Sequence, residues 1–139
     1  DTLNSVPEDT GVVDEVLGQL ESIQIKMTFD GKEAVITLLQ NPTSQSLLDM
    51  LPLDLTFEDY AGSEKISYLP SELSLHDAPS GYDPQIGDVT CYAPWGNLAI
   101  FYQDGAYARG LVPIGHVESG IELLAAMKGS FGVTLERVD

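Results

Sequence analysis

Apolar and polar residues alternate along most of the chain, which is the pattern of half-buried β-strands. In the first run, residues 22–29, the Ile, Met and Phe positions face one side while Gln, Lys and Thr face the other. Asp30-Gly31 follows this run and is typical of a type I′ hairpin turn. The same pattern predicts eight strands in all, at residues 22–29, 33–39, 53–60, 64–69, 87–93, 98–102, 111–117 and 131–138.

Two segments carry the signals of short helices instead. Residues 41–51 begin with Asn41, a good N-cap, directly before a proline that suits the first helical position, and leucines line one face. A second helix is predicted at residues 120–128, because Ser119 and Glu122 have the spacing of a capping box. A lysine and then a glycine end this segment, as is usual at a helix C-terminus.

The order of these elements predicts a mainly β fold. Eight short strands with hairpin turns and no internal repeat favour a closed eight-stranded barrel, and the two helices are placed to cap its ends. The barrel domain is predicted at residues 22–139, after an acidic tether at residues 1–21 that is partly disordered or contains a short helix. Residues 70–86 are rich in Pro, Ser and Asp and predict a long loop, a kind of segment that is often functional or mobile.

The charge of the chain limits its partners. Its 139 residues include 22 acidic and 6 basic side chains, which gives a formal net charge of -16. Such a surface repels phosphate backbones and anionic membranes, so we expect no nucleic acid partner. No run reaches the roughly 18–20 apolar residues of a membrane-spanning helix, so no direct membrane insertion is expected. A solvated coat explains the acidic surface most simply, although it also favours a cation or a basic peptide.

Cysteine and histidine are too few for the common metal sites. Cys91 is the only cysteine, which excludes an internal disulfide and a Cys-based zinc site, and its apolar neighbours predict a buried thiol. His76 and His116 have no second ligand at metal-binding spacing, so we expect no metal and no cofactor. The chain begins with Asp1 rather than Met. We interpret this either as removal of an export or lipid-anchor signal or as truncation of a cytoplasmic protein.

Several separated phrases of the sequence resemble one known family. They lie at residues 56–60, 64–70, 81–84, 87–88, 92–102 and 115–127. In this order they are similar to the small bacterial and archaeal cyclophilin-like domain family, which is distinct from the true isomerases. The resemblance covers about residues 23–138 and implies an eight-stranded cyclophilin-like barrel. The activity of that family is largely unassigned.

The resemblance to true cyclophilins is weakest where isomerisation takes place. Their active face relies on an Arg of an early central strand, with a Gln and a Phe nearby. A donor aimed at the prolyl nitrogen weakens the amide resonance that sets a rotation barrier of roughly 18–20 kcal/mol. The comparable strand here, residues 53–59, has no Arg, and Arg109 and Arg137 are the only two in the chain. The resemblance therefore implies a domain without a standard peptidyl-prolyl isomerase site.

An aromatic-lined cleft is the candidate functional site. Trp95 lies on the turn between two apolar strands, where a purely structural Trp is unexpected, and six tyrosines are many for a small domain. The predicted lining is Phe57, Glu58, Tyr60, Tyr82, Tyr92, Trp95, Phe101 and Arg109. Alternation does not allow all these side chains to face one way, so some belong to the core. We expect a small molecule or a peptide segment as the ligand.

Two alternatives to this binding site stay open. Arg109 is one of few basic residues among many acids, so an ordinary ion pair explains it as well as ligand binding does. Glu58 with a tyrosine and Arg109 favours an enzyme instead, either a prolyl isomerase or another activity that uses the same cleft for acid–base chemistry.

Overall fold

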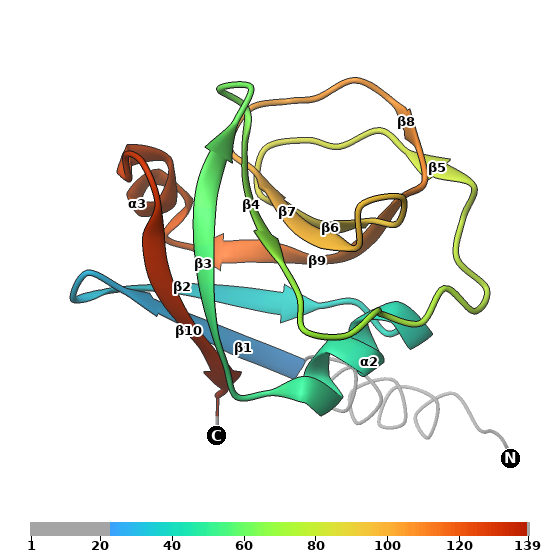
Figure 1. Ribbon diagram of the computed structural model, residues 1–139, viewed down its shortest axis with the longest axis horizontal. Helices are drawn as coiled ribbons and strands as arrows, with labels where there is room; N and C mark the ends of the chain where they lie inside the picture. The colour runs from blue at the N-terminus through green and yellow to red at the C-terminus, as the bar shows by residue number, and fades with distance from the viewer. Residues whose placement is uncertain (1–22, 139) are drawn as a thin grey trace, which may run out of the picture.

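The computed structural model describes residues 23–138, and the predicted tether lies outside this range. Eight antiparallel strands close into a barrel in the order β1-β10-β3-β4-β7-β6-β9-β2, which confirms the predicted fold (Figure 1). The strands are β1 (Ile23–Phe29), β2 (Lys32–Leu38), β3 (Leu53–Tyr60), β4 (Glu64–Tyr68), β6 (Asp88–Tyr92), β7 (Asn97–Phe101), β9 (Leu111–Ser119) and β10 (Phe131–Arg137). Closure leaves the barrel without the free strand edges of an open sheet.

The barrel interior is filled by the inward side chains of alternate strand positions. The phenylalanines meet at one end, where the ring of Phe131 lies 5.8 Å from that of Phe29 and 6.2 Å from that of Phe57. Phe57 is completely buried. Each fully buried side chain of this size contributes roughly 1.5–3 kcal/mol to folding, so the interior holds most of the stability of the domain.

The first helix, α2 (Pro42–Met50), begins as the sequence predicts. The Asn41 side chain accepts a hydrogen bond from the backbone N–H of Ser44 at 2.8 Å, and the Ser44 hydroxyl accepts one from the backbone N–H of Asn41 at 3.3 Å. Asn41 also donates through its side-chain amide to the carbonyl of Pro113 at 3.1 Å. The cap therefore joins the helix to β9 as well as satisfying its first turn.

The second helix, α3 (Ile121–Ala126), is shorter than predicted, and the proposed Ser119 capping box is wrong. Ser119 is still the last residue of β9, and Gly120 takes the cap position with φ of +97° and no side-chain cap. A Cβ at Gly120 would lie 2.8 Å from Cα of Ala34, so the strand must end in a residue without a side chain. A backbone contact, which the capping pattern does not encode, therefore decides where α3 begins.

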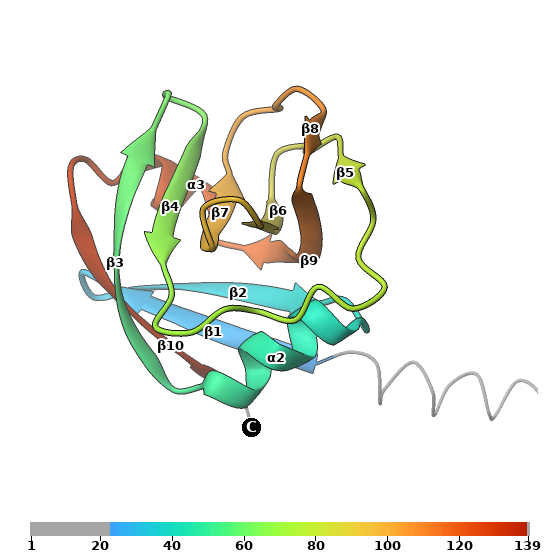
Figure 2. The ribbon, with the colours of Figure 1, turned by 45° about the vertical axis from the view of Figure 1, so that its right-hand side comes forward.

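Two short strands form a second sheet outside the barrel that the sequence pattern does not predict. They are β5 (Gly81–Tyr82) and β8 (Ala108–Arg109), and they pair antiparallel. Figures 1 and 2 show them together beside β6, β7 and β9. The predicted loop at residues 70–86 thus contributes one strand to a cover over the outer face of the barrel wall.

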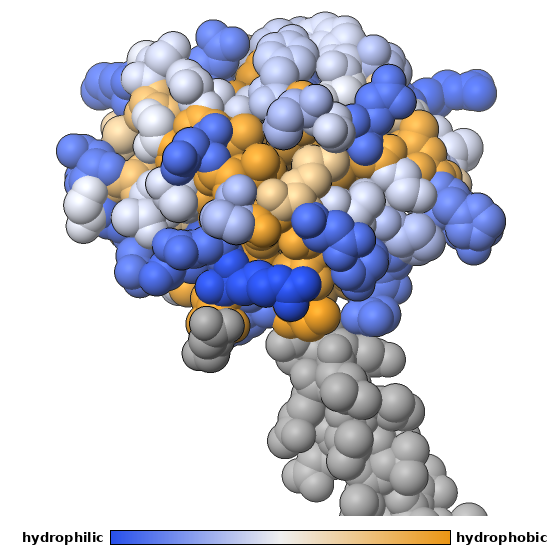
Figure 3. All heavy atoms as spheres, turned by 60° about the horizontal axis from the view of Figure 1, so that its bottom comes forward, coloured by the Kyte–Doolittle hydropathy of each residue, from blue (hydrophilic) through white to orange (hydrophobic). Residues whose placement is uncertain are grey.

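The opposite end of the molecule carries α2. In Figure 3 this end shows apolar surface in patches between hydrophilic side chains. Within residues 23–138 no helix is both long and apolar enough to cross a membrane.

Candidate functional site

A second apolar cluster, here called the outer cluster, lies on the outside of the barrel wall. Its buried members are Ile66, Ala99, Phe101 and Leu111, with Tyr82, Tyr92 and Ala108 packed against them. Their strand neighbours Leu98 and Ile100 belong to the interior core instead. Because successive side chains of a strand face opposite sides, β7 contributes to two separate cores. The outer cluster forms the floor on which the candidate site is built.

A hollow of about 260 Å³, here called the outer hollow, opens above this floor. It is lined by Tyr60, Ser63, Glu64, Tyr92, Trp95, Phe101, Gly105, Ala106, Ala108 and Leu111. The lining brings together four residues of the predicted site from three strands and a turn, namely Tyr60, Tyr92, Trp95 and Phe101. A second hollow of about 290 Å³ lies on another side of Trp95, between residues 68–72 and residues 93–96.

At the outer hollow the ring of Trp95 stands nearly perpendicular to the rings of both Tyr60 and Tyr92. The Trp95 ring centroid lies 5.4 Å from that of Tyr60 and 5.3 Å from that of Tyr92, with interplanar angles of 85° and 81°. Trp95 is 44% exposed and Tyr60 is 43% exposed. Edge-to-face pairs of this kind contribute about 0.5–1.5 kcal/mol beyond burial. The pairs hold the rings in place and still leave much of Tyr60 and Trp95 open to solvent.

The turn between β6 and β7 fixes the position of Trp95. The backbone N–H groups of Trp95 and Gly96 both donate to the carbonyl of Tyr92, at 3.1 and 2.9 Å. Ala93 donates to the carbonyl of Gly110 at 2.8 Å, which ties the turn to the start of β9. A Cβ at Gly110 would lie 2.8 Å from Cδ of Pro94, so this close approach requires glycine. Backbone hydrogen bonds and close packing therefore hold the turn that carries Trp95 in a fixed position.

Glu64 is the charged residue of the outer hollow, and the sequence interpretation missed it. Burial, the largest effect, raises the pKa of its carboxyl group above the ordinary value, although a hydrogen bond from Ser63 opposes this. In the sheet Glu64 is opposite Tyr60 on β3 and Phe101 on β7. Alternation gives the available signal, because Glu64 shares a face with Ile66 two residues later.

The other predicted lining residues lie elsewhere. The placement of Phe57 in the cleft is wrong, because its position in β3 points into the barrel and the side chain is fully buried. Glu58 is exposed and lines a different depression, beside Tyr68. Arg109 is exposed on β8 next to Ala108, outside the outer hollow, and within residues 23–138 no acidic side chain forms an ion pair with it.

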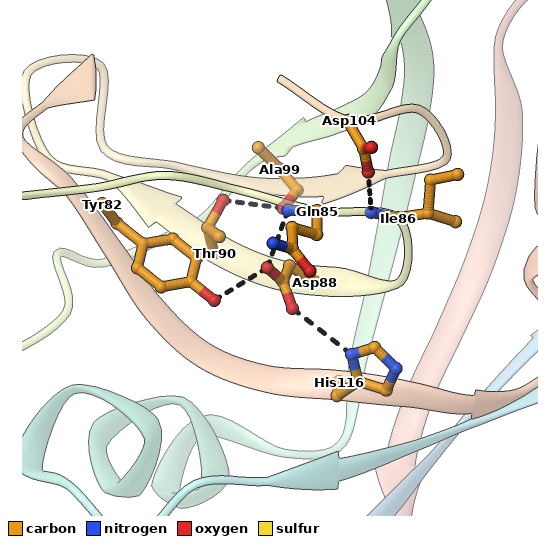
Figure 4. Close-up of polar contacts among 8 residues, drawn as sticks. All are labelled: Tyr82, Gln85, Ile86, Asp88, Thr90, Ala99, Asp104 and His116. Carbon is orange, nitrogen blue, oxygen red and sulfur yellow. Dashed lines mark hydrogen bonds and ion pairs between the residues drawn. The ribbon is translucent and has the colours of Figure 1, made fainter. Parts of the chain in front are cut away.

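Tyr82 supports the site from beneath. Its hydroxyl donates to the carboxylate of Asp88 at 2.8 Å, and the backbone N–H of Gln85 donates to the same oxygen at 2.9 Å (Figure 4). The other oxygen of Asp88 lies 3.3 Å from Nδ1 of His116. Burial first, and then the bond to Asp88, raise the pKa of Tyr82 to about 12. Asp88 thus fastens the segment that carries β5 to strands β6 and β9.

The side chains that commonly bind metal ions form no cluster of three or more in the part of the chain that the structure describes. Across residues 23–138, no three His, Cys, Asp or Glu side chains gather as a metal ion requires. Cys91 is buried, and burial raises the pKa of its thiol to about 11, which disfavours the reactive thiolate.

The barrel is similar to known proteins in both sequence and structure. A family model described as the cyclophilin-like family matches residues 27–136, which is most of the barrel. The chain belongs to the cyclophilin-like family. This cyclophilin-like chain is also similar to a hypothetical protein of Archaeoglobus fulgidus whose structure was determined in solution. The two share 19% identity over 85% of this chain and 96% of the other, with a TM-score of 0.65. No curated protein matches the chain.

These findings confirm the resemblance seen in the sequence and the barrel architecture. At 19% identity the similarity to the archaeal structure shows a shared fold alone. The function of the cyclophilin-like chain therefore has to be argued from its own residues.

Proposed function

We propose that this cyclophilin-like domain is a binding module that takes a small molecule or a peptide segment in the outer hollow. The observation that carries the proposal is the half-exposed aromatic set, Tyr60, Tyr92 and Trp95, held over a buried apolar floor. Aromatic side chains with a polar tip supply large, rigid contact area at low entropic cost, which is typical of binding sites.

The shape of the surface agrees with a ligand site. Trp95 borders both hollows, and each has an apolar side and a small number of polar groups, as ligand pockets commonly do. A volume of about 260 Å³ is close to the lower end for small-molecule pockets, roughly 300 Å³, so the outer hollow suits a compact group. A peptide would place one side chain in it and continue past Trp95.

The experiment uses the single Trp of the chain, whose indole N–H gives one resolved NMR signal. We expect a saturable shift of this signal with at least one member of a panel of proline-containing peptides and small aromatic, anionic and cationic compounds. The shift is lost in Tyr92→Ala, while the remaining spectrum shows that this variant folds. A panel in which no compound moves the Trp95 signal, or moves only residues far from it, contradicts the proposal.

Prolyl isomerisation at the same hollow is the competing function. The lining of the outer hollow includes no Arg, Lys or His to donate to a prolyl nitrogen. We expect no acceleration of cis–trans exchange in a short X-Pro peptide, which takes roughly tens to hundreds of seconds unaided. A rate that rises in proportion to protein concentration and falls in Tyr92→Ala would instead establish the isomerase.

A further inference from the structure

The lining of the outer hollow carries a negative charge and no positive one. Of its lining residues, Glu64 is the one that carries a formal charge at neutral pH. The neighbouring hollow beyond Trp95 repeats this pattern with Glu72. Within residues 23–138 no Lys, Arg or His lies at ion-pair distance from Glu64. A half-buried carboxylate without a basic partner therefore faces a space that a ligand can enter.

The charged carboxylate of Glu64 is energetically unfavourable in this position unless a cation binds beside it. Partial burial disfavours its charged form, as the raised pKa of its carboxyl group shows. The nearby carboxylate of Asp59 adds repulsion of the same sign. A positive group in the hollow would offset both penalties, and the net charge of -16 on the whole chain would attract that group from solution.

The aromatic walls favour the same kind of ligand. Ring faces carry partial negative charge and attract cations within about 6 Å of the ring centre. Because the Trp95 ring stands nearly perpendicular to those of both Tyr60 and Tyr92, the rings differ in direction around the space rather than stacking into a slot. Walls in several directions suit a compact rounded cation better than a flat aromatic ligand.

We propose that the outer hollow binds an alkylated ammonium group, with its positive charge beside Glu64 and its methyl groups against Tyr60, Tyr92 and Trp95. This inference rests on the proposed binding function and names the chemical class of the ligand. The same group occurs on free molecules such as choline and on a trimethylated lysine of a peptide.

The test follows Trp95 fluorescence during titration with choline and, separately, with 3,3-dimethylbutan-1-ol, which has the same shape without the charge. We expect choline to bind at least about tenfold more tightly, as cation–π attraction together with the Glu64 charge implies. A trimethyllysine peptide and its norleucine counterpart form the second arm. Tighter binding of this peptide than of choline identifies a peptide source, and the reverse identifies a free molecule.

Matched variants isolate the carboxylate. Glu64→Gln keeps the shape of the side chain and is expected to weaken choline binding about tenfold while leaving the uncharged isostere unchanged. Glu58→Gln is the control, because Glu58 lies on the neighbouring strand but outside the outer hollow. Thermal unfolding of both variants checks that each is folded.

The outcomes separate the two proposals. Equal binding of choline and its uncharged isostere, with no effect of Glu64→Gln, overturns the ammonium inference and leaves the binding module intact. Binding confined to aromatic, anionic or proline-containing compounds of the NMR panel does the same. If neither ammonium compounds nor any member of that panel perturbs Trp95, both proposals fall.

Discussion

Glu64 and Lys65 are neighbours in β4, yet they lie on opposite sides of the barrel wall. Lys65 points inward and its side chain is 2% exposed, with the ammonium 2.6 Å from the carbonyl of Met127 and 3.3 Å from the carboxylate of Asp59. It also lies over the rings of Tyr102 and Phe131, at 5.2 and 5.8 Å from their centres. Glu64 points outward into a hollow and has no basic partner among the described residues.

This contrast distinguishes a charge with a structural role from a charge that is a candidate for ligand binding. The inward lysine has partners on β3 and at the end of α3, so it helps to close that end of the barrel. The outward carboxylate of Glu64 has no basic partner among residues 23–138. Aromatic side chains divide in the same way, because Phe29, Phe57 and Phe131 fill the interior whereas Tyr60, Tyr92 and Trp95 gather at the outer hollow. A side chain whose charge or apolar surface is paired within the fold is structural. A side chain that remains without such a partner among the described residues is a candidate for ligand binding.

The largest expected effect comes from breaking the interior aromatic set. Phe57→Ala removes a completely buried ring that stacks against Phe131 and should lower the free energy of unfolding by about 3–5 kcal/mol. Urea denaturation followed by far-ultraviolet circular dichroism measures this loss. A cost near that of a surface substitution would mean that Phe57 is not part of the core.

A smaller loss of stability is expected from substitution of Asp59, the acidic partner of Lys65. The hydrogen bond from Tyr102 is the main reason that the pKa of Asp59 is lowered, and Lys65 adds to it. Because Asp59 is partly exposed, solvent screening limits the cost of Asp59→Asn to roughly 1 kcal/mol at neutral pH.

The pH dependence of this effect has a definite sign. The pKa of Asp59 is depressed in the folded state, so its stabilisation is fully present above the unfolded value of about 3.9 and is lost as pH falls through the lower folded value. Unfolding curves of the wild type and Asp59→Asn should therefore differ at pH 7 and converge in strong acid. A difference that persists unchanged into strong acid contradicts the role of the Asp59 charge.

The smallest effect has the opposite sign and lies at the outer hollow. The pKa of Glu64 is raised in the folded state, so folding becomes less favourable as pH rises through the range between the unfolded and folded values. Glu64→Gln should raise stability at pH 7 by about a few tenths of a kcal/mol, and the gain should disappear below the unfolded pKa. Thermal unfolding at pH 7 and pH 3 measures both. A loss of stability at pH 7 would show that Glu64 supports the fold.

The sequence predicts the barrel well because its signals are local. Alternating runs and the Asp30-Gly31 turn, where both residues have positive φ, specify strands and hairpins without reference to the rest of the chain. The strands β5 and β8 carry no such signal, because two residues are too few for a period and the pairing joins segments far apart in sequence. The start of α3 depends on a contact between Gly120 and Ala34, which is likewise not local.

The candidate site is predictable in part. Residue type and position predict Trp95, Tyr60, Tyr92 and Phe101 as site residues, and these four side chains line the outer hollow together. Alternation from Leu55, which is buried, places Phe57 inside the barrel, so the strand period itself excludes Phe57 from the cleft. Alternation places Glu64 on the same face of β4 as Ile66, but its position at the site depends on its cross-strand neighbours Tyr60 and Phe101, which the local pattern does not give.

The most direct measurement compares the stability cost of aromatic residues on the two sides of the wall. The double variant Tyr60→Ala/Trp95→Ala removes two rings that are each more than 40% exposed. If these rings serve binding, the urea midpoint should indicate a loss of at most about 3 kcal/mol, the upper range of the two edge-to-face pairs that Trp95 forms with Tyr60 and Tyr92. Phe57→Ala, measured in parallel, should lose more, about 3–5 kcal/mol. An equal or greater loss in the double variant would show that the outer aromatics hold the fold together and would contradict their assignment to a binding site.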